Sequence, residues 1–315
     1  MHCYTQRNHM RNKLLFFCII TSFILPFRSA FPASEVIIIK SSDIIPYQKS
    51  IEGFKQGFSQ GSFSEYSIDE DYKERGRSVV DGAVKGGGDL ILSVGPQATY
   101  LLGTFSSSIP KIFTMVKNPE KLFGSGKVYH GVSLDIPIEL QLEQIKAAFP
   151  KRKRIGVFFS RENNQQTIDS LLPKALALEL DLVAVPITST KEIPDSLKSL
   201  QTDIDILWII PDRVVGSEKI LKYIIKSMII KKIPVVGFNE WFAQNGAILS
   251  FSLDYEAIGK QTAILAQRVL DSQEPLEGII QEPQQVKTIV NLKVAKKLSI
   301  TVSEDLLMQA GEVIK

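Results

Sequence analysis

Hydrophobic positions after residue 34 alternate between two periods. Val36–Ile39 is a continuous β-branched run, which is typical of a strand buried on both faces. The next stretch places Ile51, Phe54 and Phe58 at the i, i+3 and i+7 spacing of one helix face. The alternation continues along most of the chain, so apolar runs and amphipathic stretches follow one another regularly.

The pattern predicts a series of strand–helix units. The expected strands after the first are Tyr66–Ile68, Asp89–Val94, Lys111–Met115, Arg154–Phe159, Leu182–Ile187, Ile204–Ile210 and Val235–Phe238. The expected helices are Tyr47–Gln60, 72–85, Gln97–Leu102, Ile138–Phe149, Thr167–Glu179, Ile193–Leu200 and Ser217–Ile230. Strands alternating with helices indicate parallel sheets. Two such runs meet near Tyr129–Asp135, so we expect an α/β protein of two doubly wound, Rossmann-like lobes.

The N-terminus has the pattern of an export signal. A basic stretch over residues 1–13 precedes Leu14–Phe27, an apolar run of 14 residues interrupted by Pro26. A membrane-spanning helix needs about 20 apolar residues, so we expect a cleavable signal peptide over residues 1–33. The cut is expected near residues 30–34, and the mature protein is expected in the periplasm. An uncleaved anchor and a buried N-terminal helix remain the alternatives.

Composition excludes several functions for the body of the protein, the chain after residue 30. The chain has 315 residues, 37 basic and 34 acidic. The first 30 residues hold four of the basic ones and no acidic one, which leaves 33 basic against 34 acidic residues. A nearly neutral body has no electrostatic footprint for nucleic acid. The same 30 residues contain both cysteines and two of the three histidines, so the body can form no disulfide, cysteine nucleophile or Cys/His metal site. We expect no cofactor.

Two segments resemble catalytic motifs but lack the flanking elements or the residues that those motifs need. Gly57–Gly61 spells G-x-S-x-G, but it ends a predicted helix, whereas a nucleophile elbow needs a strand before the serine. We interpret it as a helix end with a left-handed glycine cap. Gly124–Lys127 lacks the first Gly and the Ser/Thr of a phosphate loop. His130 is interpreted as structural and Lys151–Arg154 as a solvated basic face. The sequence does not predict an enzyme.

Polar residues gather where the predicted strands end. In open α/β sheets, ligands bind outside the carboxyl ends of the strands, so both lobes are expected to contribute to one cleft for a small polar ligand. The expected ligand-binding residues are Ser42, Asp43, Tyr47, Gly95, Pro96, Gln97, Val116, Asn118, Asn163, Asn164, Asp212, Asn239 and Glu240.

Each of these residues also has a structural interpretation. Asp212 could cap the helix over 217–230, and Asn163 or Asn164 could cap the helix that follows them, expected at Thr167–Glu179, because Asp and Asn are favoured at helix N-caps. Their joint placement at strand ends favours the ligand site.

Several segments carry a family resemblance from about residue 35 to the end. They include Asp89–Gly95, Ile109–Phe113, Asp254-Tyr255, Gly259–Thr262 and Asn291-Leu292. Their order and spacing resemble the bacterial ABC-transporter substrate-binding proteins of the tryptophan/tyrosine-binding type, which have the type I periplasmic binding protein fold. In that family the matching aspartate, Asp212 here, contacts ligand.

The resemblance implies three crossovers between the lobes, near 131–135, 250–254 and 280–285. Lobe 1 would comprise 34–132 and 253–281, and lobe 2 would comprise 133–252 and 282–315. It also implies a monomer that closes around a small-molecule ligand, an amino acid or a related compound, and delivers it to an ABC permease in the membrane.

Two residues depart from the family pattern. Asn118-Pro119 stands where the family usually has Asp-Pro, and Arg213 follows Asp212 where a small or neutral residue is usual. An amino acid's ammonium needs carboxylate partners, whereas a guanidinium binds carboxylate or phosphate. Two other functions remain open: a sensory module of the same fold that signals to a membrane partner without transport, and a secreted enzyme.

Overall fold

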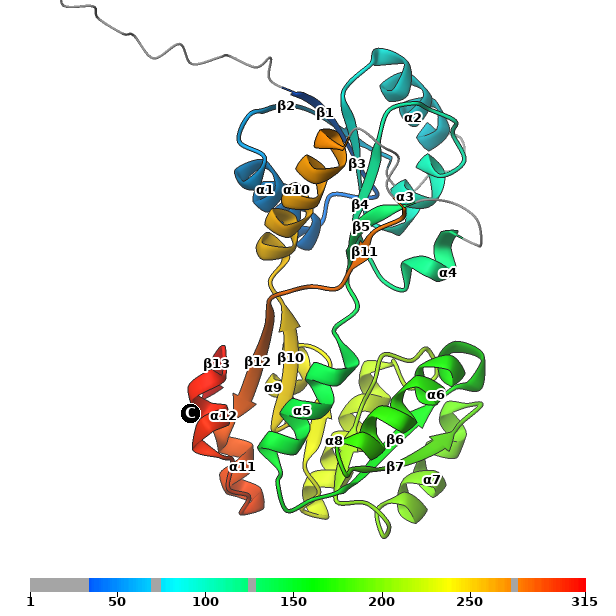
Figure 1. Ribbon diagram of the computed structural model, residues 1–315. Coiled ribbons are helices and arrows are strands. Elements are labelled where there is room, and N and C mark those ends of the chain that lie inside the picture. Colours follow the sequence, from blue (N-terminus) through cyan, green and yellow to red (C-terminus); the bar gives the residue numbers. More distant parts are fainter. Residues whose placement is uncertain (1–33, 69–74, 124–128, 273–276) are drawn as a thin grey trace, which may run out of the picture. The chain divides into compact units, whose positions relative to one another are not determined.

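The computed structural model describes residues 34–68, 75–123, 129–272 and 277–315 (Figure 1). The expected signal peptide, the first residues of the expected helix 72–85 and the glycine-rich loop 124–127 lie wholly or partly outside these residues. The described chain forms two sheets, each covered by helices, which confirms the predicted fold of two doubly wound α/β lobes.

The first sheet has six strands in the order β11-β5-β4-β3-β1-β2, all parallel. We call this sheet and its helices lobe 1. Its strands are β1 (Ser34–Lys40), β2 (Gly61–Ser67), β3 (Leu90–Val94), β4 (Lys111–Val116), β5 (His130–Ser133) and β11 (Ile280–Gln281). Its helices are α1 (Ile45–Gly57), α2 (Arg75–Gly86), α3 (Pro96–Leu102), α4 (Pro119–Phe123) and α10 (Tyr255–Asp271).

The second sheet has seven strands in the order β13-β12-β10-β9-β8-β6-β7, parallel except for the β10–β12 pair. We call it, with its helices, lobe 2. Its strands are β6 (Arg154–Phe159), β7 (Asp181–Pro186), β8 (Ile206–Trp208), β9 (Val235–Gly237), β10 (Leu249–Leu253), β12 (Val286–Asn291) and β13 (Glu312–Ile314). Its helices are α5 (Ile138–Ala148), α6 (Arg161–Ala177), η1 (Thr190–Glu192), α7 (Ile193–Leu200), α8 (Glu218–Ile230), α9 (Glu240–Gln244), α11 (Leu292–Leu298) and α12 (Glu304–Gln309).

The β-branched run at the start of the body divides between the two faces of the lobe 1 sheet. Val36 and Ile38 pack on the face covered by α1 and α10, whereas Ile37 and Ile39 pack on the face covered by α2 and α3. All four side chains are at most 2% exposed. A central parallel strand is buried on both sides, and this explains its continuous apolar sequence.

Lobe 2 is built in the same way around β6. Ile155, Val157 and Phe159 face a core with α5, α6 and the C-terminal helices, while Phe158 faces the core formed by α7 and α8. Both lobes therefore hold their central strands, and the residues that follow them, between two helical layers.

Three segments connect the two sheets. Residues 134–137 lead from β5 to α5, Asp254 joins β10 to α10, and residues 282–285 lead from β11 to β12. The domain boundaries proposed from the sequence fall in or beside these segments and remain predictions.

One predicted boundary needs correction. The helix expected at Thr167–Glu179 begins six residues earlier, at Arg161, because the polar first turn of α6 hides its apolar periodicity. The crossovers expected near 131–135 and 250–254 overlap the ends of the strands His130–Ser133 and Leu249–Leu253, and the connections begin directly after these strands. The pattern did not predict the short elements α4, η1, α9, β11, α11, α12 and β13.

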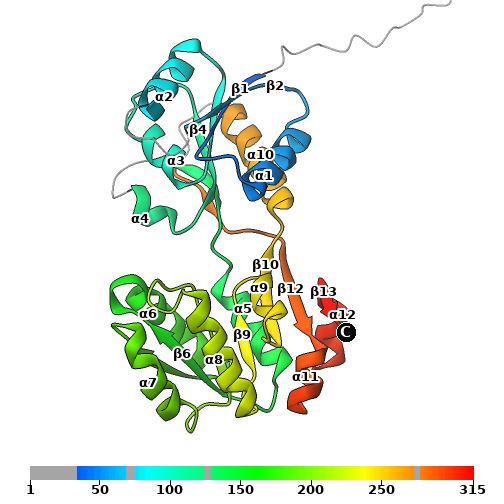
Figure 2. The same ribbon diagram turned by 180° about the vertical axis from the view of Figure 1, so that it is seen from behind.

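The interpretation of Gly57–Gly61 as a helix end with a left-handed glycine cap is right about the helix end and wrong about the cap. Gly57 ends α1, and neither Gly57 nor Gly61 has a positive φ. The place of Gly57 is explained by packing against α10. A Cβ on Gly57 would lie 2.8 Å from the Cβ of Ala263. One turn earlier, a Cβ on Gly53 would lie 2.0 Å from the backbone oxygen of Glu256. The glycines therefore allow α1 and α10 to lie side by side (Figures 1 and 2).

His130 agrees with its structural interpretation. It is 9% exposed, and its Nδ1 accepts a hydrogen bond from the backbone N–H of Ile279 at 3.3 Å. Burial lowers the pKa of the imidazole, as expected for a neutral histidine that joins β5 to β11.

We expect Gly259→Ala to lower the free energy of unfolding by about 1–3 kcal/mol, the usual cost of overpacking. Its Cβ would lie 1.9 Å from the backbone oxygen of Ser50 on α1, so the two helices would have to separate. Gly82→Ala is the control. Gly82 lies in α2 with nothing within 4 Å of its Cβ position, and we expect a gain of up to about 1 kcal/mol. Urea melts of both variants test this, and equal effects would contradict the packing argument.

Candidate functional site

At the carboxyl edge of the lobe 1 sheet, the side chains of two other segments lie close to Gly95. It follows β3 with φ +88°, a conformation that favours glycine. A Cβ there would lie 2.6 Å from the Tyr47 hydroxyl and 2.7 Å from the Ser41 Oγ. The loop after β1, the first turn of α1 and the end of β3 therefore meet around one residue without a side chain.

Ser41 and Tyr47 differ in what their polar atoms do. The Ser41 Oγ accepts a hydrogen bond from the backbone N–H of Ala98 at 2.9 Å, which ties the β1 loop to α3. Tyr47 is half-buried, and burial raises the pKa of its phenol. The raised pKa keeps the phenol protonated. Among the described residues the hydroxyl has no hydrogen-bond partner, so it is available to a ligand.

Asp43 is engaged in an ion pair. Its Oδ1 lies 2.5 Å from the Nζ of Lys40, which also lies 3.4 Å from Glu65. The hydrogen bond to Asp43 raises the pKa of Lys40, although partial burial opposes this. Ser42 is half-buried beside the exposed Asp43. The carboxylate that follows β1 therefore already has a cationic partner.

The end of β4 is held by a residue that the sequence analysis missed. Asn118 has φ +46°, and its backbone N–H donates to the Oδ2 of Asp135 at 2.8 Å. Burial raises the pKa of Asp135, against the effects of the Asn118 N–H and of Lys117. Asp135 follows β5, so the strand-end rule would have found it if residues 130–133 had been interpreted as a strand. Val116 is fully buried.

Asp212 is the centre of a hydrogen-bond network at the corresponding edge of lobe 2. Its Oδ2 accepts from the Ser160 N–H at 2.8 Å, the Ser160 Oγ at 2.7 Å and the Asn164 Nδ2 at 2.7 Å. Its Oδ1 accepts from the N–H groups of Val214 at 2.8 Å and Val215 at 3.4 Å. Burial alone would raise the pKa of Asp212, but these donors outweigh it and lower the pKa.

The network shows that Asp212 does not cap a helix. Ser217 occupies the N-cap of α8 and Ser160 that of α6, so Asn163 and Asn164 lie inside the first turn of α6. Asn163 donates its Nδ2 to the Ser160 Oγ at 2.6 Å. Both capping interpretations from the sequence are therefore wrong. The carboxylate instead joins the end of β8 to the start of α6.

The remaining predicted residues lie at the surface. Gln97 is exposed and Pro96 half-buried at the start of α3. Asn239 is exposed at the N-cap of α9 without a capping hydrogen bond, and Glu240 accepts from the Gln244 Nε2 at 2.8 Å. The structure thus brings Tyr47 together with Gly95, and Asn163 and Asn164 together with Asp212.

Gln261, which the strand-end rule could not find, fixes one of the connecting segments. It is 8% exposed on α10. Its Nε2 donates to the Gln281 Oε1 and to the Glu282 backbone oxygen, both at 3.0 Å, and its Oε1 accepts from the Gln284 N–H at 3.0 Å. These three bonds attach the connection between β11 and β12 to lobe 1.

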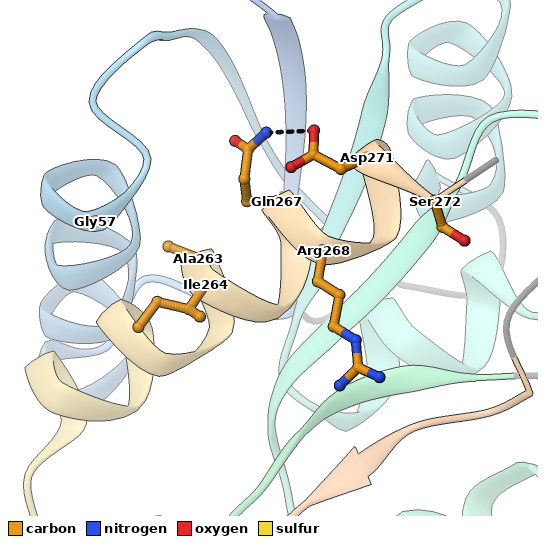
Figure 3. Close-up of a pocket in the computed structure, with 7 residues that line it drawn as sticks. All are labelled: Gly57, Ala263, Ile264, Gln267, Arg268, Asp271 and Ser272. Carbon is orange, nitrogen blue, oxygen red and sulfur yellow. Dashed lines mark hydrogen bonds between the residues drawn. The ribbon is translucent and has the colours of Figure 1, made fainter.

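A hollow of about 670 Å³ lies away from the strand ends, at the C-terminal ends of α1 and α10 (Figure 3). The Gln267 Nε2 donates to Asp271 at 2.9 Å, while Arg268 extends from another side of α10. No predicted ligand-binding residue lines it. Its lining residues are Gly57, Ala263, Ile264, Gln267, Arg268, Asp271 and Ser272. A hollow with its polar groups bonded to each other or diverging is a poor small-molecule site.

Two further searches cover only the described residues. No group of three or more His, Cys, Asp or Glu side chains could hold a metal ion there. None of the helices described is both long enough and apolar enough to cross a membrane.

Two open α/β lobes joined by three connections, with polar residues at the carboxyl edges of both sheets, define the type I periplasmic binding protein fold. Solved structures share it. A ligand-free, open substrate-binding protein with adhesive properties from Clostridium difficile has a TM-score of 0.76 and 19% identity, covering 90% of this chain and 99% of that one. An ABC domain from Streptococcus pneumoniae in complex with L-Trp has a TM-score of 0.59 and 21% identity, covering 89% and 100%.

The chain belongs to the ABC transporter substrate-binding protein family, whose model matches residues 71–314. A curated relative, a tyrosine-binding protein of Clostridioides difficile (strain R20291), is 26% identical over 220 residues. The match spans 67% of this chain and 63% of the length of that relative. The family is one of binding proteins and not of enzymes, and the resemblance seen in the sequence is confirmed.

We expect Asp212→Asn to lower the free energy of unfolding at neutral pH by about 1–3 kcal/mol, because buried donors lose a charged acceptor. The native carboxyl has a lowered pKa, so its stabilisation is present above the unfolded value near 3.8 and is lost as pH falls below it. The variant should therefore lose less stability than the wild type over that acidic range.

The control is Asp169→Asn on the exposed face of α6, where the carboxylate accepts a single bond from Gln165 at 2.9 Å. Denaturant melts between pH 3 and pH 7 compare the three proteins. Wild-type stability and pH dependence in Asp212→Asn would show that the network contributes nothing to folding.

Proposed function

We propose that this protein is the extracytoplasmic receptor of an ABC importer, binding an aromatic amino acid or a related small polar molecule. The observation that carries the proposal is the family match over residues 71–314, together with polar side chains at the carboxyl edges of both sheets. The curated relative is a tyrosine-binding protein, and one solved structure of the same fold holds L-Trp. These two ligands support an aromatic amino acid as the class to test first.

The proposed site combines both edges. Tyr47, with a free hydroxyl above Gly95, is suited to hydrogen-bond a ligand in lobe 1. In lobe 2 we expect Asp212 to act by holding Ser160 and Asn164 in place, since its own acceptor capacity is filled. The remaining proposed contacts are Ser42, Asp43, Pro96, Gln97, Asn118, Asn163, Asn239 and Glu240. Val116 is also expected from the sequence, but its side chain is fully buried and it is not proposed as a contact.

Ligand binding is proposed to close the lobes about the three connecting segments. Two lobes that each offer part of a site gain contacts with a ligand only when they approach each other. The bonds of Gln261 to residues 281–284 support a defined pivot. The proposed partner of the closed form is an ABC permease, with the receptor acting as a monomer and without nucleic acid.

We expect the natively purified protein to release a bound small molecule on denaturation, identifiable by mass spectrometry. Adding that compound, or L-tyrosine and L-tryptophan, to the stripped protein should reduce the radius of gyration measured by small-angle scattering, because closure brings the lobes together. The same titration with glycine is the control for non-specific effects. Saturable binding with an unchanged radius would contradict closure, and no binding of either amino acid would contradict the proposed ligand class.

Export is proposed from the sequence of residues 1–33. A receptor for a membrane permease must lie outside the cytoplasm, and the apolar run Leu14–Phe27 is too short to span a bilayer. Intact-mass measurement of the protein from the periplasmic fraction should show a chain that begins between residues 30 and 35. A mass that includes Met1 would contradict cleavage.

A further inference from the structure

Lys117 is an unpaired cation at the ligand edge of lobe 1. It directly follows β4, whose neighbours in the sheet are β3 and β5. The backbone on both sides is fixed, since the Leu134 N–H donates to the Val116 oxygen at 2.8 Å and the Asn118 N–H donates to Asp135 at 2.8 Å. The side chain of Lys117 is exposed, and among the described residues it forms no hydrogen bond or ion pair.

The carboxylates at the same edges have partners already. Asp43 pairs with Lys40 at 2.5 Å, and Asp135 accepts the Asn118 N–H. In lobe 2, Asp212 accepts four donors at 2.7–2.8 Å, which fill its four lone-pair sites, and a fifth, the Val215 N–H, at 3.4 Å. A ligand that reaches these edges therefore meets a free ammonium group, while the carboxylates are already bonded.

The electrostatic environment of Lys117 agrees with this geometry. The surrounding protein disfavours the charged form and lowers the pKa of Lys117, although the side chain remains open to solvent. Asp135 opposes this shift, and Lys121 reinforces it. A ligand anion would replace the lost solvation and would favour the charged ammonium.

We propose that Lys117 binds a carboxylate of the ligand and thereby selects ligands that carry an anionic group. This inference rests on the proposed function and specifies the chemistry of its ligand. It places the selective cation in lobe 1, at the end of β4, and assigns no such role to Arg213, which is exposed in the turn after Asp212.

The test uses three probes that share one aromatic ring. L-Tyrosine has a carboxylate and an ammonium, 3-(4-hydroxyphenyl)propionate has the carboxylate alone, and tyramine has the ammonium alone. Calorimetric titration of the wild-type protein should show binding of the two probes that carry a carboxylate, L-tyrosine and 3-(4-hydroxyphenyl)propionate. Tyramine should bind about ten- to hundredfold more weakly than L-tyrosine, the factor that corresponds to a charge-assisted hydrogen bond.

Two variants of Lys117 separate charge from packing. Lys117→Met should weaken binding of L-tyrosine and of 3-(4-hydroxyphenyl)propionate by about tenfold or more, with tyramine unaffected. Lys117→Arg keeps the positive charge and should retain most of the affinity for both carboxylates. The matched control is Lys146→Met, in the last turn of α5 and so near the opposite, amino edge of the lobe 2 sheet. Melts confirm that all three variants are folded.

The outcomes separate the inference from the proposed function. Tyramine binding as tightly as L-tyrosine, or full affinity for the carboxylates in Lys117→Met, would overturn the role of Lys117 and leave the aromatic ligand class intact. Binding of none of the three probes to the wild-type protein would overturn the ligand class, and with it the inference.

Discussion

The contact between α1 and α10 is the constraint on which the architecture depends. α10 follows β10, a strand of lobe 2, yet it packs in lobe 1 against the first helix of the body. Gly53 and Gly259 make this possible, since each brings its own backbone to that of the other helix, where a Cβ would lie 2.0 Å or less from a carbonyl oxygen. Because α10 returns to lobe 1 and β12 then pairs with β10 in lobe 2, the chain crosses between the lobes three times.

The two sheet edges use charge in different ways. In lobe 2, the Asp212 carboxylate accepts its hydrogen bonds from the protein itself, and it joins the end of β8 to the first turn of α6. In lobe 1, Asp135 secures the turn at Asn118, and the neighbouring Lys117 forms no hydrogen bond or ion pair with any residue that the structure describes. At this edge the acidic groups accept hydrogen bonds or ion pairs within the protein, so the Lys117 ammonium is the group left available to a ligand anion.

The elements with strong periodicity could be predicted from the sequence, and the weak ones could not. Val36–Ile39 is a continuous apolar run, and α8 has its apolar residues on one buried face, so their patterns predict a strand and a helix. β5 has only four residues and begins with a histidine, and α6 opens on a run of polar residues. Such elements are determined by contacts with distant segments, such as the pairing of β5 with β4 and β11 and the hydrogen bonds of Ser160 and Asn164 to Asp212. The hydrophobic periodicity of the sequence, with its periods of 2 and 3.6 residues, does not show these influences.

For the site, the strand-end rule identified polar residues that follow strands in both sheets, but it could not say which of them were still free to bond. That depends on contacts between distant segments: Asp212 with Ser160 and Asn164, 48 to 52 residues apart, and Asp135 with Asn118. Other hydrogen bonds indicate which side chains would move together in the proposed closure. Gln261 holds the start of the third connection to lobe 1 and Asp254 caps α10 through the Ala257 N–H at 3.0 Å. In the proposed closure, bending therefore falls beyond these bonds, and Tyr47, Gly95 and Lys117 move together as parts of one rigid edge.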